Sequence, residues 1–229
     1  MISMAINFDV IAARRSVRRY VPRTIDAEAV ARLRALTAEA NAGAGLALQL
    51  VTDEPDAFGK SFLAHYGHFK NVRNYIAVVA PDTDEGGIAA GYQGERIVLE
   101  AKVLGLDSCW VGLTFKRGKV PVDIAPGMKL YALIAVGYGA ESPKPHKSKR
   151  PADVSEGYGE GNEAFDRGVD CALMAPTALN RQNFRFVLCR DGAVTATAKR
   201  RAYAALDLGI AVFHYEFASG LKVSRLSIS

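Results

Sequence analysis

Apolar and polar positions divide most of the chain into helices and strands. Apolar residues that recur every three or four positions predict helices, and bounded runs of β-branched and apolar residues predict strands. The predicted helices are 7–13, one that starts at Thr24 or Asp26 and ends before Gly43, 88–104, 165–174 and 206–217. The predicted strands are 46–51, 75–80, 128–136 and 184–189, and 16–21 is extended up to Pro22. Because the two kinds of element alternate, we expect a mixed α/β or α+β fold with helices covering a sheet.

One long segment shows no apolar periodicity. Residues 137–160 are rich in Gly, Pro, Lys and Ser, and we interpret this stretch as a linker. The chain on its two sides carries a faint internal echo, since 32–53 and 170–191 both run from a helix through a break and an alternating strand to an Asp. Chance similarity between two helix–strand units and a real internal duplication both explain the echo.

A second, shorter echo uses a different offset. Ala101, Leu104, Gly105 and Leu106 correspond to Ala205, Leu208, Gly209 and Ile210. If both echoes are real, the chain is a fused pair of related halves.

The composition restricts the class of protein. With 229 residues and 49% hydrophobic content the chain can bury a full core, so disorder is not expected. The net charge of +5 favours anionic ligands, but the excess is too modest to predict a nucleic-acid partner. Three cysteines without a Cys-x-x-Cys pair indicate neither a disulfide framework nor a zinc site, and a reducing cytoplasm fits. We find no signal peptide and no apolar run long enough to cross a membrane.

A cluster of basic residues follows the first predicted helix. In an extended segment Arg14, Ser16 and Arg18 share one face, and guanidinium forks with a hydroxyl between them suit a phosphate group. A solvated basic surface is the alternative interpretation of the same spacing. Taken alone, the cluster leaves both open.

Other kinds of site find little support. His65 and His68 share a helical spacing, but no carboxylate or cysteine pattern accompanies them, so no metal site is predicted. The chain has no Gly-x-Gly-x-x-Gly after a strand and no P-loop, which argues against a resident Rossmann-type cofactor. Cys109 has no base beside it in the sequence, and we expect a buried structural thiol.

Several motifs together resemble one family. The segment 14–20 (RRSVRRY) is similar to the N-terminal Arg-x-Ser-x-Arg/Lys-x-aromatic signature of FMN-dependent nitroreductases. The segment 104–112 (LGLDSCWVG) resembles the stretch after that family's central helix, and 175–186 (APTALNRQNFRF) resembles its Ala-Pro-Ser-x-x-Asn-x-Gln-Pro-Trp-x-Phe motif. The segment 146–151 (HKSKRP) is similar to the family's late basic phosphate segment, so the resemblance covers most of the chain.

The order of these motifs is unusual for the family. Ordinary nitroreductases carry the Ala-Pro-Ser motif in the first quarter, where this chain has 40–45 (ANAGAG), and the good copy appears only at Ala175. The chain thus resembles a smaller branch, the thermophilic-type nitroreductases, in which one polypeptide imitates a two-subunit arrangement. The resemblance implies a nitroreductase-like α+β fold with an antiparallel-rich sheet flanked by helices. It also implies a first half, 1–150, that grips the FMN phosphate and a shorter second half, 151–229, that completes the site.

The resemblance assigns FMN to a composite site. Arg14, Ser16 and Arg18 would hold the phosphate, with Arg15 near the ribityl or pyrimidine end and the two late lysines finishing the grip. Trp110 would pass beside the flavin, or be a core aromatic, and Asn180 would bond the ring, or finish a helix. The cofactor-binding residues implied are Arg14, Arg15, Ser16, Arg18, Trp110, Val111, Gly112, Lys147, Lys149, Pro176, Thr177, Ala178 and Asn180.

The implied activity is hydride transfer by a ping-pong mechanism, from NAD(P)H to a small nitroaromatic or quinone acceptor. The cofactor carries the chemistry, so we nominate no catalytic side chain and no metal. Three alternatives remain: another flavin reaction on the same scaffold, a flavin-binding or storage protein without turnover, and a nucleic-acid-binding module. We expect a monomer that mimics a dimer, or a homodimer, in the cytoplasm.

Overall fold

The computed structural model describes residues 6–58 and 69–229, which form two compact units. Unit 1 consists of Met1–Asp82 and Arg96–Pro145, and unit 2 of Thr83–Glu95 and His146–Ser229. Each unit contains one four-stranded sheet with helices packed on it. That 1–150 and 151–229 are duplicated halves stays a prediction.

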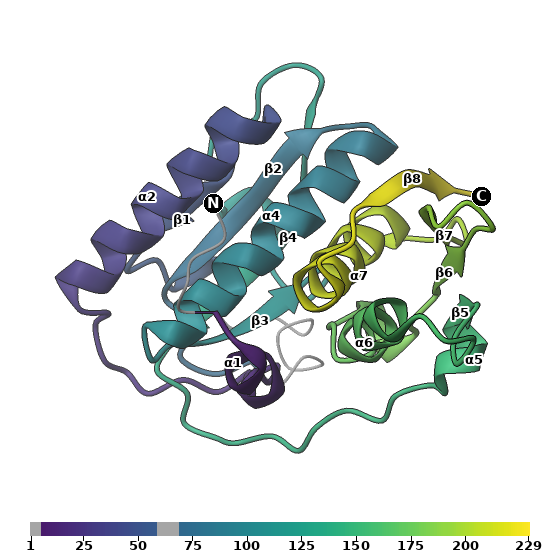
Figure 1. Ribbon diagram of the computed structural model, residues 1–229. Helices are drawn as coiled ribbons and strands as arrows, with labels where there is room; N and C mark the ends of the chain where they lie inside the picture. The colour runs from purple at the N-terminus through teal and green to yellow at the C-terminus, as the bar shows by residue number, and fades with distance from the viewer. Residues whose placement is uncertain (1–5, 59–68) are drawn as a thin grey trace. The chain divides into compact units, whose positions relative to one another are not determined.

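The sheet of unit 1 is antiparallel throughout, in the order β1-β2-β4-β3 (Figure 1). Its strands are β1 (Gln49–Val51), β2 (Tyr75–Pro81), β3 (Asp107–Val111) and β4 (Met128–Gly137). β1 is shorter than the predicted 46–51. The ladder continues at Ala47, whose N–H donates to the Val79 carbonyl at 2.9 Å. β1 is an edge strand, and Asn41, near the end of α2 (Ala27–Ala44), satisfies Leu48 there: its side-chain amide accepts from the Leu48 N–H at 2.7 Å and donates to the Leu48 carbonyl at 2.9 Å.

α1 (Phe8–Ala13) and the start of α2 lie where the sequence predicts, but α2 runs through Gly43 and ends two residues later than expected. Asn7 caps α1, since its side chain accepts from the Val10 N–H at 3.0 Å. α2 starts after Asp26 and ends at Gly45, which has the left-handed φ of 62° that glycine adopts without strain. Figure 1 shows α2 and the C-terminal part of α4 (Asp84–Val103) along one side of the sheet.

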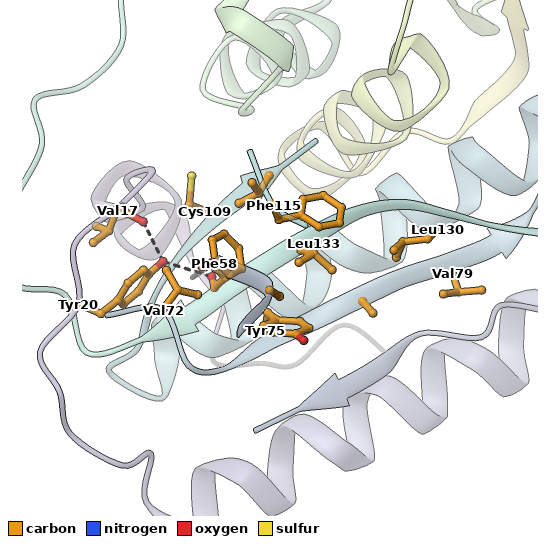
Figure 2. Packing of buried hydrophobic residues seen from close by; sticks show 14 residues of the cluster. Val17, Tyr20, Phe58, Val72, Tyr75, Val79, Cys109, Phe115, Leu130 and Leu133 are labelled. Atoms are coloured by element: carbon orange, nitrogen blue, oxygen red, sulfur yellow. Dashed lines mark hydrogen bonds between the residues drawn. The ribbon is translucent and has the colours of Figure 1, made fainter. Parts of the chain in front are cut away.

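The opposite side of this sheet carries an aromatic and aliphatic core (Figure 2). Every second residue of β2 points into it, beginning with Tyr75, because side chains alternate between the two faces of a strand. Tyr20 joins this core from the arginine-rich segment, and its hydroxyl lies 2.8 Å from the Val17 carbonyl and 3.3 Å from that of Ala135. Burial raises the pKa of Tyr20 far above its usual value, so this phenol stays a neutral hydrogen-bond donor.

Unit 2 is built around an apolar helix, α7 (Ala204–Ser219) (Figure 1). Its sheet has the order β5-β6-β7-β8, with an antiparallel β6–β7 pair between two parallel pairs. The strands are β5 (Ser155–Glu156), β6 (Phe184–Leu188), β7 (Val194–Ala198) and β8 (Val223–Ile228), and the other helices are α5 (Pro151–Val154) and α6 (Glu163–Ala172). Among the described residues, short 3₁₀ turns form at η1 (Asp56–Phe58) and η2 (Arg117–Lys119) in unit 1 and at η3 (Ala178–Asn180) in unit 2.

Glycines let the first turns of α4 cross α7 with their backbones in contact. A Cβ on Gly209 would lie 2.0 Å from the Ile88 carbonyl oxygen, and one on Gly91 would lie 2.2 Å from the Leu206 carbonyl oxygen. Gly209 lies in the middle of α7, away from either end of the helix. Gly105 instead ends α4 with a φ of 76°, so the second sequence echo, which equated Gly105 with Gly209, has no structural counterpart.

Three other expectations need correction. The predicted linker 137–160 is too long, because Gly137 belongs to β4 and α5 and β5 occupy 151–156. The strands β7 and β8 were not predicted, although β7 alternates between buried and half-buried positions and contains Val and Thr, which is a strand pattern that was overlooked. α4 starts at Asp84, four residues before its predicted start.

Candidate functional site

The arginine-rich segment of unit 1 leaves α1 and runs beside the start of β3. The Arg14 N–H closes the helix by donating to the Val10 carbonyl at 3.0 Å. Ser16 forms a parallel bridge with Ser108, and the Val17 N–H donates to the Ser108 carbonyl at 3.0 Å. The predicted extended conformation is confirmed, and β3 fixes the backbone from which the arginines project.

The side chains of this segment differ in their surroundings. Arg14 is buried, with 5% of its surface exposed. The Arg15 guanidinium turns back and donates to the Ala12 carbonyl and, at 2.8 Å, to the Arg14 carbonyl, where it satisfies the end of α1. Glu141 also lies against the segment, since it accepts from the Arg18 N–H at 3.1 Å and pairs with Arg19 at 3.7 Å. Sequence reasoning missed Glu141, which lies in the predicted linker.

β3 carries Trp110 and Val111 past this segment, and Gly112 directly follows the strand. Cys109 and Val111 face the core of unit 1, so Val111 offers a ligand only its backbone groups, while Trp110 is half-buried on the other face of the strand. Burial raises the pKa of Cys109 to about 11, although Arg18, Arg14 and a hydrogen bond with Ser16 act in the opposite direction. The expectation of a buried, structural thiol at Cys109 is confirmed.

In unit 2 the predicted proline–threonine–asparagine motif forms a tight turn at η3. Leu179, Asn180 and Gln182 all have positive φ, at 55°, 53° and 47°. Residues other than glycine adopt this region at a cost, most of all a bulky side chain such as Leu. The turn is held by internal bonds, since the Thr177 hydroxyl oxygen accepts from the Gln182 N–H at 3.0 Å. The side chain of Asn180 bonds outside the turn and does not simply finish a helix.

The late basic segment lies against this turn. The Asn180 side chain donates to the Lys147 carbonyl at 2.7 Å. The backbone N–H of Lys149 donates to the Gln182 side chain at 2.7 Å, and its ammonium donates to the Gln182 carbonyl at 3.0 Å. Gln182 and His146 also meet at the Leu173 carbonyl, at 2.8 and 3.0 Å. Two motifs about 30 residues apart in the sequence, both assigned to one cofactor, are thus in contact within unit 2.

The half-buried carboxylate of Asp207 bonds to this turn, and sequence reasoning missed it. Asp207, in the first turn of α7, accepts the Ala178 N–H with both oxygens, at 2.9 and 3.1 Å. Burial raises the pKa of Asp207 to about 7, and the bond from Ala178 lowers it. Acidic residues are common in the first turn of a helix, so nothing in the sequence marks this contact.

Sequence comparison identifies the family. Residues 7–219 match the model of a family described as "Putative TM nitroreductase". This chain belongs to that family. The resemblance of the motifs at 14–20, 104–112 and 175–186 is thereby confirmed at the level of the family. No sequence among the curated proteins matches the chain.

A solved nitroreductase structure shares the fold, and others match part of the chain. A "putative nitroreductase" from Thermotoga maritima superposes with a TM-score of 0.66, at 22% identity over 92% of this chain and 82% of that one. An FMN-dependent nitroreductase from Clostridium difficile has a TM-score of 0.47, at 21% identity over 60% and 90% of the two chains. A "putative nitroreductase" from Desulfovibrio desulfuricans, solved in complex with FMN, has 0.48, at 20% identity over 66% and 94%. The predicted α+β, nitroreductase-like fold class is confirmed.

The predicted site residues of this nitroreductase-family chain divide between the two units. Unit 1 holds Arg14, Arg15, Ser16, Arg18, Trp110, Val111 and Gly112. Unit 2 holds Lys147, Lys149, Pro176, Thr177, Ala178 and Asn180. Within each unit the structure brings the sequence-distant motifs together. Their joint assignment to one cofactor stays a prediction.

Neither a cluster of metal ligands nor a membrane-spanning helix is found among the residues that the structure describes. Within 6–58 and 69–229, no three His, Cys, Asp or Glu side chains gather as metal ligands would. The histidine pair at 65 and 68 lies outside the described residues. Among the helices that the structure describes, none is both long and apolar enough to span a membrane.

Proposed function

We propose that this chain is an FMN-dependent oxidoreductase that takes hydride from NAD(P)H and passes it to a small nitroaromatic or quinone acceptor. Membership of the nitroreductase family supports an oxidoreductase of this type. The observation that carries the proposal is the arginine–serine segment held beside β3, because its donors have the chemistry that a flavin phosphate requires.

The donors of unit 1 suit a phosphate monoester. We propose that Arg14, Ser16 and Arg18 bind it, with two guanidinium forks and a hydroxyl on one extended segment. Because Arg14 is buried, water competes weakly for its hydrogen bonds, which strengthens them. Glu141 offsets part of the positive charge, so the segment selects an anion that makes several directed bonds over one attracted by charge alone.

The polar groups of unit 2 suit the ring and ribityl chain. Asn180 uses one amide N–H for the Lys147 carbonyl and presents an oxygen that can accept from a ring imide. The Thr177 oxygen accepts from Gln182, so its own hydroxyl hydrogen can be donated to a ligand. The Ala178 N–H is bonded to Asp207, so we assign the ligand only the side chain and carbonyl of Ala178.

The residues of this chain orient the reactants, and no side chain need act as an acid or base. Bound FMN would supply the group that accepts and returns hydride. We propose that Trp110, Val111 and Gly112 line the cofactor from unit 1, with Pro176 from unit 2. The ammonium groups of Lys147 and Lys149 add positive charge, which stabilises anionic groups. In the proposed ping-pong order, the oxidised nicotinamide leaves before the acceptor binds. A cytoplasmic location, and a monomer or homodimer, stay predictions.

A visible spectrum of the purified protein with added FMN, followed by anaerobic titration with NADH or NADPH, tests the proposal. We expect flavin absorbance near 450 nm that travels with the protein through gel filtration and bleaches on adding either nicotinamide. Reoxidation by a nitroaromatic or quinone then completes the cycle. A colourless protein that retains no FMN contradicts the proposal.

The same experiment separates the alternatives. Bound FMN that neither nicotinamide reduces indicates flavin storage or another flavin reaction. Salt-sensitive binding of DNA or RNA that free FMN does not compete away indicates a nucleic-acid-binding module. Both outcomes contradict the proposed activity, and the first leaves the cofactor assignment intact.

A further inference from the structure

The half-buried carboxylate of Asp207 has no role in the proposed hydride transfer, yet it bonds directly to the turn assigned to the cofactor. We propose that Asp207 is a positioning residue that sets the conformation of the 177–182 turn and makes flavin affinity depend on pH. This inference rests on the proposed function, because it concerns the same turn.

The geometry shows that Asp207 acts on the backbone of the turn. Both carboxylate oxygens accept one N–H, that of Ala178, at 2.9 and 3.1 Å. Ala178 immediately precedes Leu179 and Asn180, whose positive φ angles the chain adopts only at a cost. Such a conformation persists where surrounding bonds determine it, and the bond from Asp207 enters at its first residue. The direction of the Asn180 side chain therefore depends on Asp207.

A carboxylate makes this contact at a larger desolvation cost than a neutral acceptor would. This cost suggests that the charge has a function. Burying a charged group costs more than burying an amide or an apolar side chain. A perturbed carboxyl beside a candidate site is a common sign of function rather than of packing. The first turn of α7 compensates part of the cost, because the positive end of a helix dipole favours a negative charge.

Ionisation of Asp207 changes the strength of its bond to the turn. Burial raises its pKa to about 7, and the Ala178 bond is the other influence, which lowers it. The charged groups on the elements packed against the turn are Lys147, Lys149 and Arg181, with Tyr203 on the side of α7, and none of these acts on the titration of Asp207. Above neutral pH a carboxylate accepts the Ala178 N–H, whereas below it a neutral carboxylic acid makes a weaker bond.

Riboflavin is the probe, because it lacks the phosphate whose own ionisation near pH 6 would obscure the effect. Its dissociation constant is measured by fluorescence quenching from pH 5.5 to 8.5 on the full chain. We expect the unmodified chain to bind riboflavin roughly three- to tenfold more weakly at the acid end. Asp207→Asn should bind with nearly constant affinity across the range, because an amide oxygen accepts the same N–H without titrating. Asp207→Ala should bind more weakly than either at pH 8.5.

Asp191→Asn is the matched control. Asp191 also accepts a backbone N–H, that of Ala193 at 3.0 Å, but it is exposed and lies in a different turn. This variant should retain the pH dependence of the unmodified chain. Loss of the dependence in Asp191→Asn, or its persistence in Asp207→Asn, overturns the inference.

A measurement on the flavin-free protein distinguishes a variant that has lost the turn from one that binds poorly because it is misfolded. In the flavin-free protein, amide exchange at Ala178 should accelerate in Asp207→Ala while the amides of α7 keep their protection. Equal acceleration throughout α7, or none at Ala178, contradicts the positioning role. If no variant and no parent binds FMN or riboflavin, the proposed function fails. If all bind flavin equally at every pH, only this inference fails.

Discussion

The two parts of the candidate site are built in opposite ways. In unit 1 the proposed ligand-binding groups are long charged side chains on an extended segment, and the ladder contact with Ser108 fixes their backbone. In unit 2 the proposed groups are mostly short side chains on a turn that is bent through three positive φ angles and held by the side chains of Thr177 and Asp207. Unit 1 should therefore be sensitive to charge, and unit 2 to shape and packing.

In unit 2, adding a single methyl group should be most destabilising where α4 crosses α7. In Gly209→Ala the new methyl would overlap the Ile88 carbonyl oxygen, and backbone cannot move aside as a flexible side chain can. We expect a loss of about 3 kcal/mol or more in the free energy of unfolding, measured by urea denaturation. Gly43→Ala is the control, because a Cβ there meets nothing within 4 Å and should stabilise α2 by about 0.5 to 1 kcal/mol. Equal stability of the two variants would contradict the close crossing.

Unit 1 should respond to loss of charge with loss of the phosphate contact. Arg14→Ala combined with Ser16→Ala removes two hydrogen-bonding partners, each worth about 1.5 to 3 kcal/mol if the bond is charge-assisted. We expect FMN to bind at least about 100-fold more weakly, measured by equilibrium dialysis. Riboflavin affinity should change far less. Arg34→Ala, on the exposed side of α2, should leave both affinities unchanged. An equal loss of affinity for FMN and riboflavin would contradict the assignment of the phosphate to this segment.

The stability of unit 2 should vary with pH through Asp207. Its folded pKa, about 7, lies above the ordinary value of 3.8, so the folded state holds the proton more tightly than the unfolded state. Stability from this group is complete below about pH 4 and is lost as the pH rises towards 7. Asp207→Asn should therefore be more stable than the parent at pH 8, by up to about 4 kcal/mol, and similar at pH 4. Thermal unfolding at both pH values measures the difference in stability. The same difference between variant and parent at pH 4 and pH 8 would contradict a raised pKa of Asp207.

The smallest effect concerns the thiols, which distinguish core from surface in both units. Cys109 and Cys171 are buried, with pKa values raised by burial to about 11 and about 12, whereas Cys189 is partly exposed. With a thiol reagent at pH 8 we expect only Cys189 to react quickly in the native chain, and all three in denaturant. Fast labelling of Cys109 would show that the core beside β3 opens readily.

Sequence predicted the local structure well where a strong signal marked each end. The cap of α1, the start of α2 and the buried strands β2 and β4 agree with the structure because Asn7 and long apolar runs determine them locally. β8 escaped prediction because its apolar residues do not alternate, so only its pairing with β7 marks it as a strand. β7 does alternate, and its run of five residues was overlooked.

For the site, the motifs named residues but not the contacts that hold them. Glu141 and Asp207 lie far along the chain from the groups they bond, and nothing in their neighbouring residues marks them. The positive φ of Leu179 was equally invisible, because leucine is among the residues least suited to that conformation. Such features depend on tertiary contacts, which a single sequence does not display.

The division of unit 2 into Thr83–Glu95 and His146–Ser229 has a consequence for how the chain matures on the ribosome. Synthesis of unit 1 is complete at Pro145, but the first turns of α4 must wait for α7, more than 100 residues later, before Gly91 and Gly209 meet. During that delay the apolar side of a nascent helix stays exposed, which is the condition under which chaperones engage a growing chain. This exposure ends when α7 packs against the first turns of α4.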